Sequence, residues 1–107
     1  MVKQAKYEIV FAPETAEHLA HVDAKHYPLI EQKIGEQLSH QPLRQTRNRK
    51  PLRPPAPFGA DWELRFGPQN SIRVLYEVDE LTRTVNILAI GIKDGNRLLI
   101  AGQEIKS

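Results

Sequence analysis

Two arginines in short alternating segments are the residues best placed to do chemistry. Residues 62–66 and 72–78 each alternate apolar with more polar residues, and Arg65 and Arg73 occupy polar positions. Because successive side chains of a strand point to opposite faces, each segment predicts a strand with one apolar face. Residues 67–70 are rich in turn formers and predict a β-hairpin that places both arginines on the same face.

Two guanidinium groups on one sheet face repel each other, so this face predicts a nearby anion. One interpretation is structural: Glu63 or Glu77, at polar positions of the same hairpin, pairs with Arg65 and Arg73. The other is functional, because guanidinium forks bind phosphate in a bidentate manner. In that case the two arginines, with Lys93 after the next strand, hold a phosphate backbone. The residue types alone leave both interpretations open.

The segment before the hairpin is basic and rich in proline. Residues 43–59 contain four prolines, which exclude a helix or a central strand. Residues 41–75 carry seven basic and two acidic residues, a local charge of +5, whereas the whole chain carries +2. Such a patch favours an anionic partner, although a solvated connector stiffened by proline has the same composition. The candidate RNA-binding residues here are Arg44, Arg47, Arg49, Lys50 and Arg53.

Two helices are predicted between a strand at residues 7–11 and the basic segment. The first begins at Pro13, where a missing N–H has no consequence, and ends near residue 24. Its predicted apolar face is formed by Ala16, Leu19 and Ala20. The second begins near Pro28 and repeats an apolar residue every four positions; these residues are Ile30, Ile34 and Leu38.

The order of elements predicts an α+β fold. Residues 85–91 are apolar at almost every position, as expected of a strand covered on both faces. Residues 98–100 are compatible with a last short strand or a helical turn. The resulting order is β-α-α-β-β-β, which predicts a small antiparallel sheet with two helices packed on one face.

Length and composition indicate one globular domain, residues 1–107. The chain is 40% hydrophobic and 26% charged, and it has no apolar run near the roughly 20 residues that cross a membrane. The lack of cysteine excludes disulfides and thiolate catalysis. No signal peptide is visible, and we expect a cytoplasmic protein.

Histidine and tyrosine side chains add no candidate chemistry. The four histidines show no metal-site pattern, so we interpret them as surface residues and predict no metal or other cofactor. Tyr76 is interpreted as a core residue because it shares the apolar phase of its segment. The histidines are His18, His21, His26 and His40.

Several short motifs, taken in order, carry a resemblance to a known family. They are the predicted strand at 7–11, Arg49-Lys50-Pro51-Leu52, Trp62-Glu63-Leu64-Arg65, Arg73-Val74-Leu75-Tyr76 and Ile90-Gly91-Ile92-Lys93. In this order and spacing, the chain resembles the RelE/ParE toxins of type II toxin–antitoxin modules over nearly its whole length. The resemblance implies a small sheet with two helices on one face, and a bacterial toxin that a separate antitoxin neutralises.

The RelE branch of this family cleaves messenger RNA in the ribosomal A site without a metal. By position, Arg73 matches the arginine that contacts the scissile phosphate, Arg65 a basic residue on the preceding strand, and Lys93 the basic position after the Ile-Gly strand. Fixed positive charge at these positions stabilises a phosphate whose negative charge grows as it is attacked. The resemblance therefore implies messenger RNA and the ribosome as partners, besides the antitoxin.

Three departures from the family pattern keep alternatives open. Glu63 stands where the best-known ribonucleases carry a second lysine, Asp94 stands where a basic residue often follows Lys93, and nothing aromatic follows Tyr76. Glu63 is either a general base, as carboxylates are in some relatives, or an ion-pair partner. One alternative function is that of a ParE-type toxin, which binds DNA gyrase and cleaves nothing. The other is a degenerate homologue with a regulatory role.

Overall fold

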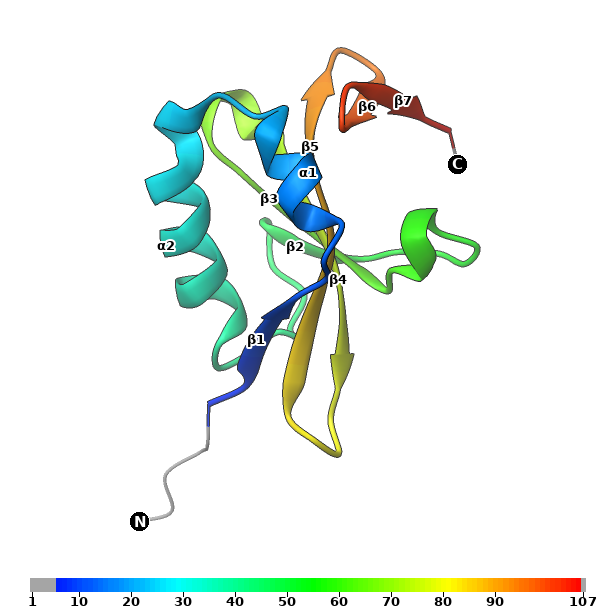
Figure 1. Cartoon of the computed structure of the whole chain (residues 1–107). Helices are drawn as coiled ribbons and strands as arrows, with labels where there is room; N and C mark the ends of the chain where they lie inside the picture. Colours follow the sequence, from blue (N-terminus) through cyan, green and yellow to red (C-terminus); the bar gives the residue numbers. More distant parts are fainter. Residues whose placement is uncertain (1–5, 107) are drawn as a thin grey trace.

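One sheet and two helices make up the described part of the chain, residues 6–106 of the computed structural model (Figure 1). Six strands follow each other in the order β2-β3-β4-β5-β6-β7, and β1 pairs with β5. The strands are β1 (Glu8–Phe11), β2 (Arg49–Pro51), β3 (Trp62–Phe66), β4 (Ile72–Asp79), β5 (Thr84–Asp94), β6 (Arg97–Ile100) and β7 (Gln103–Ile105). The helices are α1 (Thr15–Ala20) and α2 (Tyr27–Leu38), and short 3-10 turns lie at η1 (Ala24–His26), η2 (Pro57–Gly59) and η3 (Pro68–Asn70).

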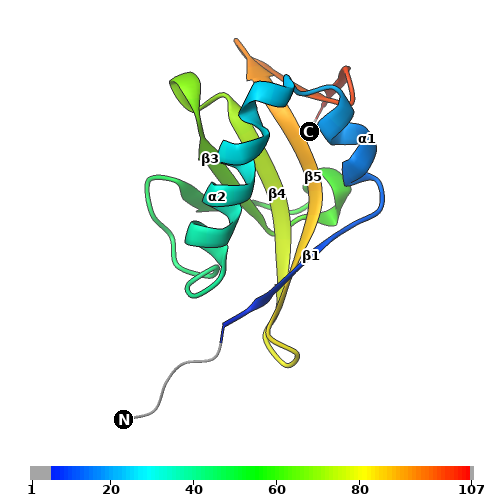
Figure 2. The ribbon, with the colours of Figure 1, turned by 60° about the vertical axis from the view of Figure 1, so that its left-hand side comes forward.

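The predicted α+β architecture is confirmed, with a larger sheet than the pattern indicated. Figure 2 shows α2 in front of the sheet and α1 beside β5. The strands from β2 to β7 pair in antiparallel fashion, whereas β1 runs parallel to β5. β6 is the last short strand that was one of two interpretations of residues 98–100. The strands β2 and β7, which were not predicted, have only three residues each. Segments of this length are too short for an alternating pattern to become visible.

The main core lies between α2 and the sheet. The predicted period-four stripe of α2 is buried against apolar residues of the three central strands, where Leu64, Val74 and Ile87 are fully buried. Tyr76 is also buried, stacks on the ring of Trp62, and donates its hydroxyl hydrogen to the carbonyl oxygen of Pro42 over 2.7 Å. Its predicted core position is therefore confirmed, and its burial raises the pKa of the phenol.

The predicted apolar face of the first helix is confirmed for Leu19, which is partly buried against the main core, and is wrong for the two alanines. α1 spans only Thr15–Ala20, and it buries Thr15 and His18 while Ala16 and Ala20 are exposed. Both buried side chains are satisfied: the Thr15 hydroxyl donates to the carbonyl oxygen of Ala12 over 2.7 Å, and His18 Nδ1 accepts from the N–H of Ile90 over 3.3 Å. Because these bonds remove the penalty for burying polar groups, hydrophobicity alone did not predict the buried face.

A smaller core covers the opposite face of the sheet. It contains Leu75 of β4, Ala89 of β5 and Ile100 of β6, with partly buried apolar residues around them. Figure 1 shows that the η2 segment and the β6–β7 hairpin lie on the side of the sheet away from α2. The strand over residues 85–91 is therefore covered on both faces, as predicted. The backbone of β6 approaches Gly91 closely on this side, because a Cβ atom at Gly91 would lie 2.5 Å from the carbonyl oxygen of Leu99.

Candidate functional site

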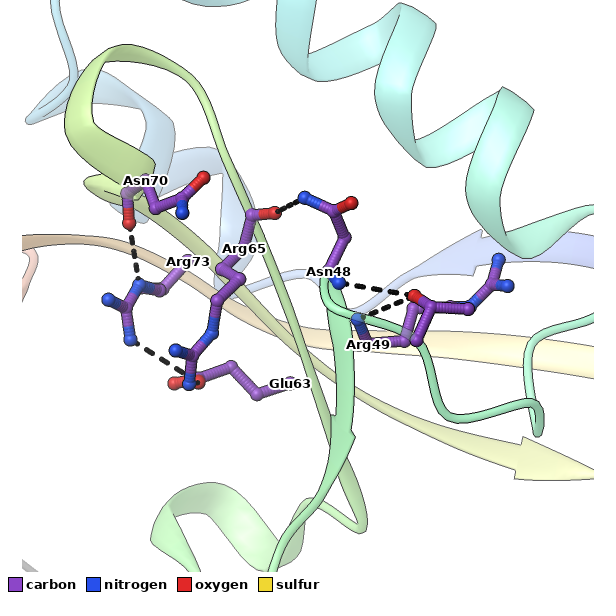
Figure 3. A network of polar contacts seen from close by, with 7 residues as sticks. Asn48, Arg49, Glu63, Arg65, Asn70 and Arg73 are labelled. Carbon is purple, nitrogen blue, oxygen red and sulfur yellow. Dashed lines mark hydrogen bonds and ion pairs between the residues drawn. The ribbon is translucent and has the colours of Figure 1, made fainter.

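Arg65 and Arg73 face each other on adjacent strands, as the hairpin pattern predicts. They are direct partners in the register of β3 and β4, on the face opposite α2. Between them lies the carboxylate of Glu63. Its Oε1 atom is 2.8 Å from Nη2 of Arg65 and 3.3 Å from Nη1 of Arg73 (Figure 3). The predicted anion beside the two guanidinium groups is thus, in this structure, a carboxylate of the same hairpin.

The cluster is held at low exposure with a net positive charge. The side chains of Glu63 and Arg73 are each 11% exposed, and that of Arg65 is 26% exposed. Two guanidinium groups and one carboxylate leave a formal charge of +1. Because charges interact more strongly where water is partly excluded, this residual charge favours an anion more than it would at an open surface.

Hydrogen bonds fix both guanidinium groups while leaving donors unused. The Arg73 side chain makes two polar contacts: Nε donates to the carbonyl oxygen of Asn70 over 2.9 Å, and Nη1 donates to Glu63 Oε1 over 3.3 Å. Its third nitrogen, Nη2, takes part in neither contact. The Arg65 backbone makes two bonds to Asn48, each of 2.9 Å. Its N–H donates to the Asn48 carbonyl oxygen, and its carbonyl oxygen accepts from Asn48 Nδ2 (Figure 3). Within residues 6–106, Arg65 Nε is buried and has no hydrogen-bond partner.

Lys93 belongs to the same face. Its backbone N–H donates to the carbonyl oxygen of Ser71 over 2.7 Å, which ties the end of β5 to the β3–β4 connection. The side chains of Lys93 and Glu63 line one hollow of about 220 Å³. Lys50 pairs with Glu63 in the register of β2 and β3 and is exposed. The four predicted catalytic residues, Glu63, Arg65, Arg73 and Lys93, therefore come together on one face.

The basic segment divides into exposed side chains and one buried arginine. Arg44, Arg47, Lys50 and Arg53 are exposed, whereas Arg49 is only 7% exposed. The Arg49 guanidinium donates to the carbonyl oxygen of Arg44 over 2.9 Å and to the Gln37 side chain over 3.1 Å. Burial lowers its pKa. Arg49 thus joins the end of α2 to the basic segment, away from Arg65 and Arg73.

His18 contradicts the interpretation of the histidines as surface residues. It is 5% exposed, and its ring meets that of Phe58 edge-on with 5.5 Å between the centroids. Burial lowers the pKa of its imidazole, and the negative charges of Glu14 and Glu17 oppose this effect. Within residues 6–106, no group of three or more His, Cys, Asp or Glu side chains is arranged to hold a metal ion.

Sequence reasoning missed the asparagines that position the site. Asn48 and Asn70 hold Arg65 and Arg73 through backbone and side-chain bonds, and Asn96 lines the hollow beside Lys93. All three occur in turns or irregular segments, where asparagine is common for local conformational reasons. Nothing in the sequence therefore distinguished these three from other turn residues.

The arrangement is suited to binding a phosphate group. Guanidinium donors that are fixed in place and partly shielded from water can form charge-assisted bonds to phosphate oxygens without reorganisation.

Of the described residues, 6–106, none belongs to a helix long and apolar enough to cross a membrane.

Comparison with solved structures finds a toxin–antitoxin complex of similar fold. The fold is similar to the crystal structure of the toxin–antitoxin complex RelBE2 from Mycobacterium tuberculosis, with a TM-score of 0.67 and 25% sequence identity. The match covers 85% of this chain and 95% of the other. No family model and no curated protein matches the sequence. The likeness therefore rests on the three-dimensional structure, and it agrees with the motifs of the sequence.

Proposed function

We propose, from the premise that this chain belongs to the RelE/ParE family of toxins, that it arrests growth by cleaving messenger RNA on the ribosome. The observation that carries this proposal is the arginine pair. Arg65 and Arg73 are fixed opposite each other by Glu63, Arg73 Nη2 takes part in neither polar contact of its side chain, and the pair lies beside Lys93 on the face away from the helices.

The proposed chemistry is attack of a ribose 2′-hydroxyl on the adjacent phosphorus. The bond from O2′ to phosphorus forms as the bond to the 5′-oxygen breaks, and negative charge grows on the phosphate oxygens in between. The 2′-hydroxyl proton passes to water and the leaving 5′-oxygen takes a proton from water, which gives a 2′,3′-cyclic phosphate and a 5′-hydroxyl end. Arg73 contributes Nη2 to these oxygens, while Arg65 and Lys93 supply further positive charge. Of the two roles considered for Glu63, we assign it that of positioning both guanidinium groups, because its Oε1 accepts from each of them.

The exposed basic residues provide the contact with ribosomal and messenger RNA. Arg44, Arg47, Lys50 and Arg53 present side chains to solvent around the cluster. Contacts of this kind are independent of base sequence and weaken as salt rises, because counterions are released when phosphates are neutralised. We leave Arg49 out of the RNA-binding set because its guanidinium is buried and bonded within the protein.

Induced expression in a bacterial host, with mapping of messenger RNA 5′ ends over the first minutes, tests the proposal. We expect new ends within translated codons, and we expect Arg73→Ala to abolish them. The matched control is Lys25→Ala, because Lys25 is exposed and lies in the helical half of the chain. Unchanged cleavage by Arg73→Ala, with the protein folded, contradicts the assignment.

The second candidate function is that of a ParE-type toxin that binds DNA gyrase. The observation that favours it is the position of Glu63, which already neutralises part of the charge that a ribonuclease site needs. This candidate predicts growth arrest without new messenger RNA ends, and inhibition of supercoiling by purified gyrase. The two functions are therefore separated by the same induction experiment.

In either case we propose a cognate antitoxin as the protein partner. Residues 41–75 carry a charge of +5, so the antitoxin segment that contacts them is expected to be acidic. Co-expression with the neighbouring reading frame tests this, since the antitoxin should restore growth and co-purify with the chain. Failure of any adjacent frame to do either favours the degenerate homologue.

A further inference from the structure

A hollow of about 220 Å³ adjoins the arginine pair on the same face of the sheet. Its walls come from segments far apart in the sequence: the end of the basic segment, the central strands, and the β6–β7 hairpin. Leu52, Leu75, Leu98 and Ile105 make the apolar part of the lining, and Glu63, Lys93 and Asn96 make the polar part. Because Glu63 is bonded to Arg65 and Arg73, the hollow and the proposed phosphate site share a side chain.

The size and lining of the hollow fit one flat ring system. Pockets for drug-sized ligands begin at roughly 300 Å³, so this smaller hollow accommodates a single base better than a dinucleotide. The apolar residues form part of the small core on this face, and Leu52, Leu98 and Ile105 remain only partly buried there. A planar base laid on these side chains would remove apolar surface from water.

The polar groups of the hollow suit the edge of a nucleobase. Both ion pairs of Glu63 use Oε1, which leaves Oε2 outside every polar contact found among residues 6–106. A carboxylate oxygen accepts hydrogen bonds from ring N–H and exocyclic amino groups. Lys93 donates to ring nitrogen or carbonyl acceptors, and the Asn96 amide can do either. Single-stranded RNA offers such edges because its bases are not paired.

We propose that this hollow binds one base of the RNA strand whose phosphate lies on Arg65 and Arg73. Glu63 then accepts a hydrogen bond from the exocyclic amino group of adenine, cytosine or guanine, or from the ring N–H of uracil. This inference rests on the proposed function, because it takes the phosphate site as given. It adds a base-binding subsite to a site that otherwise contacts only the RNA backbone.

The test uses four probes on the full chain with labelled leucine and isoleucine methyl groups: 5′-AMP, 5′-UMP, ribose 5-phosphate and inorganic phosphate. We expect 5′-AMP to shift the methyl resonances of Leu98 and Ile105 and to bind about tenfold more tightly than ribose 5-phosphate. We expect 5′-UMP to bind less tightly than 5′-AMP, because the smaller uracil ring covers less of the apolar lining. Equal affinity of 5′-AMP and ribose 5-phosphate, with no methyl shifts at Leu98 and Ile105, overturns the inference.

Two variants separate failure of the base subsite from failure of the phosphate site. Leu98→Trp fills the hollow and should remove the advantage of 5′-AMP while leaving ribose 5-phosphate binding unchanged. Its matched control is Leu81→Trp, because Leu81 is 99% exposed in the β4–β5 turn. Arg73→Ala should weaken all four probes. If ribose 5-phosphate binds through Arg73 and 5′-AMP binds no more tightly, only the base subsite is refuted. If no probe binds the wild type, the phosphate site is refuted as well.

Discussion

The two faces of the sheet use their side chains in opposite ways. Toward α2, the face is dry and apolar, and its polar groups, such as the Tyr76 hydroxyl, are bonded within the protein. The other face has only a small apolar core, and beside it stand two arginines that share one carboxylate oxygen. The difference shows how one hairpin serves both purposes: alternate residues of β3 and β4 hold the fold together or form the charged site. Substitutions on the first face should change stability, and substitutions on the second should change anion binding.

The largest effect on stability is expected for Leu64→Ala. Leu64 is fully buried between α2 and the sheet, so its truncation removes apolar burial and leaves a cavity. We expect the free energy of unfolding to fall by about 2–5 kcal/mol, measured by chemical denaturation. Leu81→Ala in the exposed turn is the control and should change the value by less than about 0.5 kcal/mol. If the two variants lose similar amounts of unfolding free energy, the face toward α2 is not the packed core that we describe.

A smaller loss, coupled to a gain in anion binding, is expected for Glu63→Gln. The substitution keeps the shape of the side chain but removes the charge that offsets Arg65 and Arg73. We expect the free energy of unfolding to fall by about 1–2 kcal/mol without added anions, because the two guanidinium groups lose the negative charge that offsets their repulsion and strengthens their hydrogen bonds. Added phosphate should raise the melting temperature of Glu63→Gln more than that of the wild type, since it binds the folded state. Equal phosphate effects in the two proteins would show that the arginines do not form an anion site.

The buried histidine should make stability depend on pH. Burial holds the pKa of His18 below its ordinary value of 6.5, so the unfolded chain takes up the proton first as pH falls. The contribution of His18 to stability is therefore fully present above about pH 6.5 and is lost as pH falls through the folded-state pKa. Denaturation curves recorded from about pH 7.5 downward through about pH 6.5 should show the onset of the loss in the wild type. His18→Asn, which keeps an acceptor near the Nδ1 position, should show less of it, and an identical pH profile would contradict the assignment.

The smallest effect is a gain at Gly35. This glycine lies inside α2, is exposed, and has open space where a Cβ atom would stand. We expect Gly35→Ala to raise the free energy of unfolding by about 0.5–1 kcal/mol, because alanine restricts the unfolded chain and favours the helix. Thermal melts would detect the change, and RNA cleavage should be unaffected because α2 covers the other face. A loss of activity in this variant would place part of the function on the helical side.

The features that depend on local periodicity were predictable from the sequence. Alternation in two segments predicted that Arg65 and Arg73 share a face, and a stripe of period four predicted the buried side of α2. The shared carboxylate was one of two interpretations, because alternation places Glu63 on the right face but does not fix its rotamer. Local pattern therefore specified where the cluster lies and left open which contacts it makes.

The features that were missed depend on contacts between distant segments. Arg49 and Lys50 are neighbours of the same charge, yet β2 turns the first toward α2 and the second toward solvent. A three-residue strand that ends in proline gives no alternation from which this could be predicted. The burial of His18 depends in the same way on the N–H of Ile90, which lies 72 positions away in the sequence.

Cleavage of messenger RNA on purified ribosomes tests the central claim most directly, because it removes every other cellular target. We expect the wild-type chain to cut within translated codons, and Arg73→Ala to cut more slowly by a factor of about 100–1,000, as for loss of one fixed donor to a developing anion. Arg73→Lys should lie between them, since it keeps the charge but loses the guanidinium fork. A folded Arg73→Ala variant that cuts at the wild-type rate would contradict the claim that the face opposite the helices is the functional site.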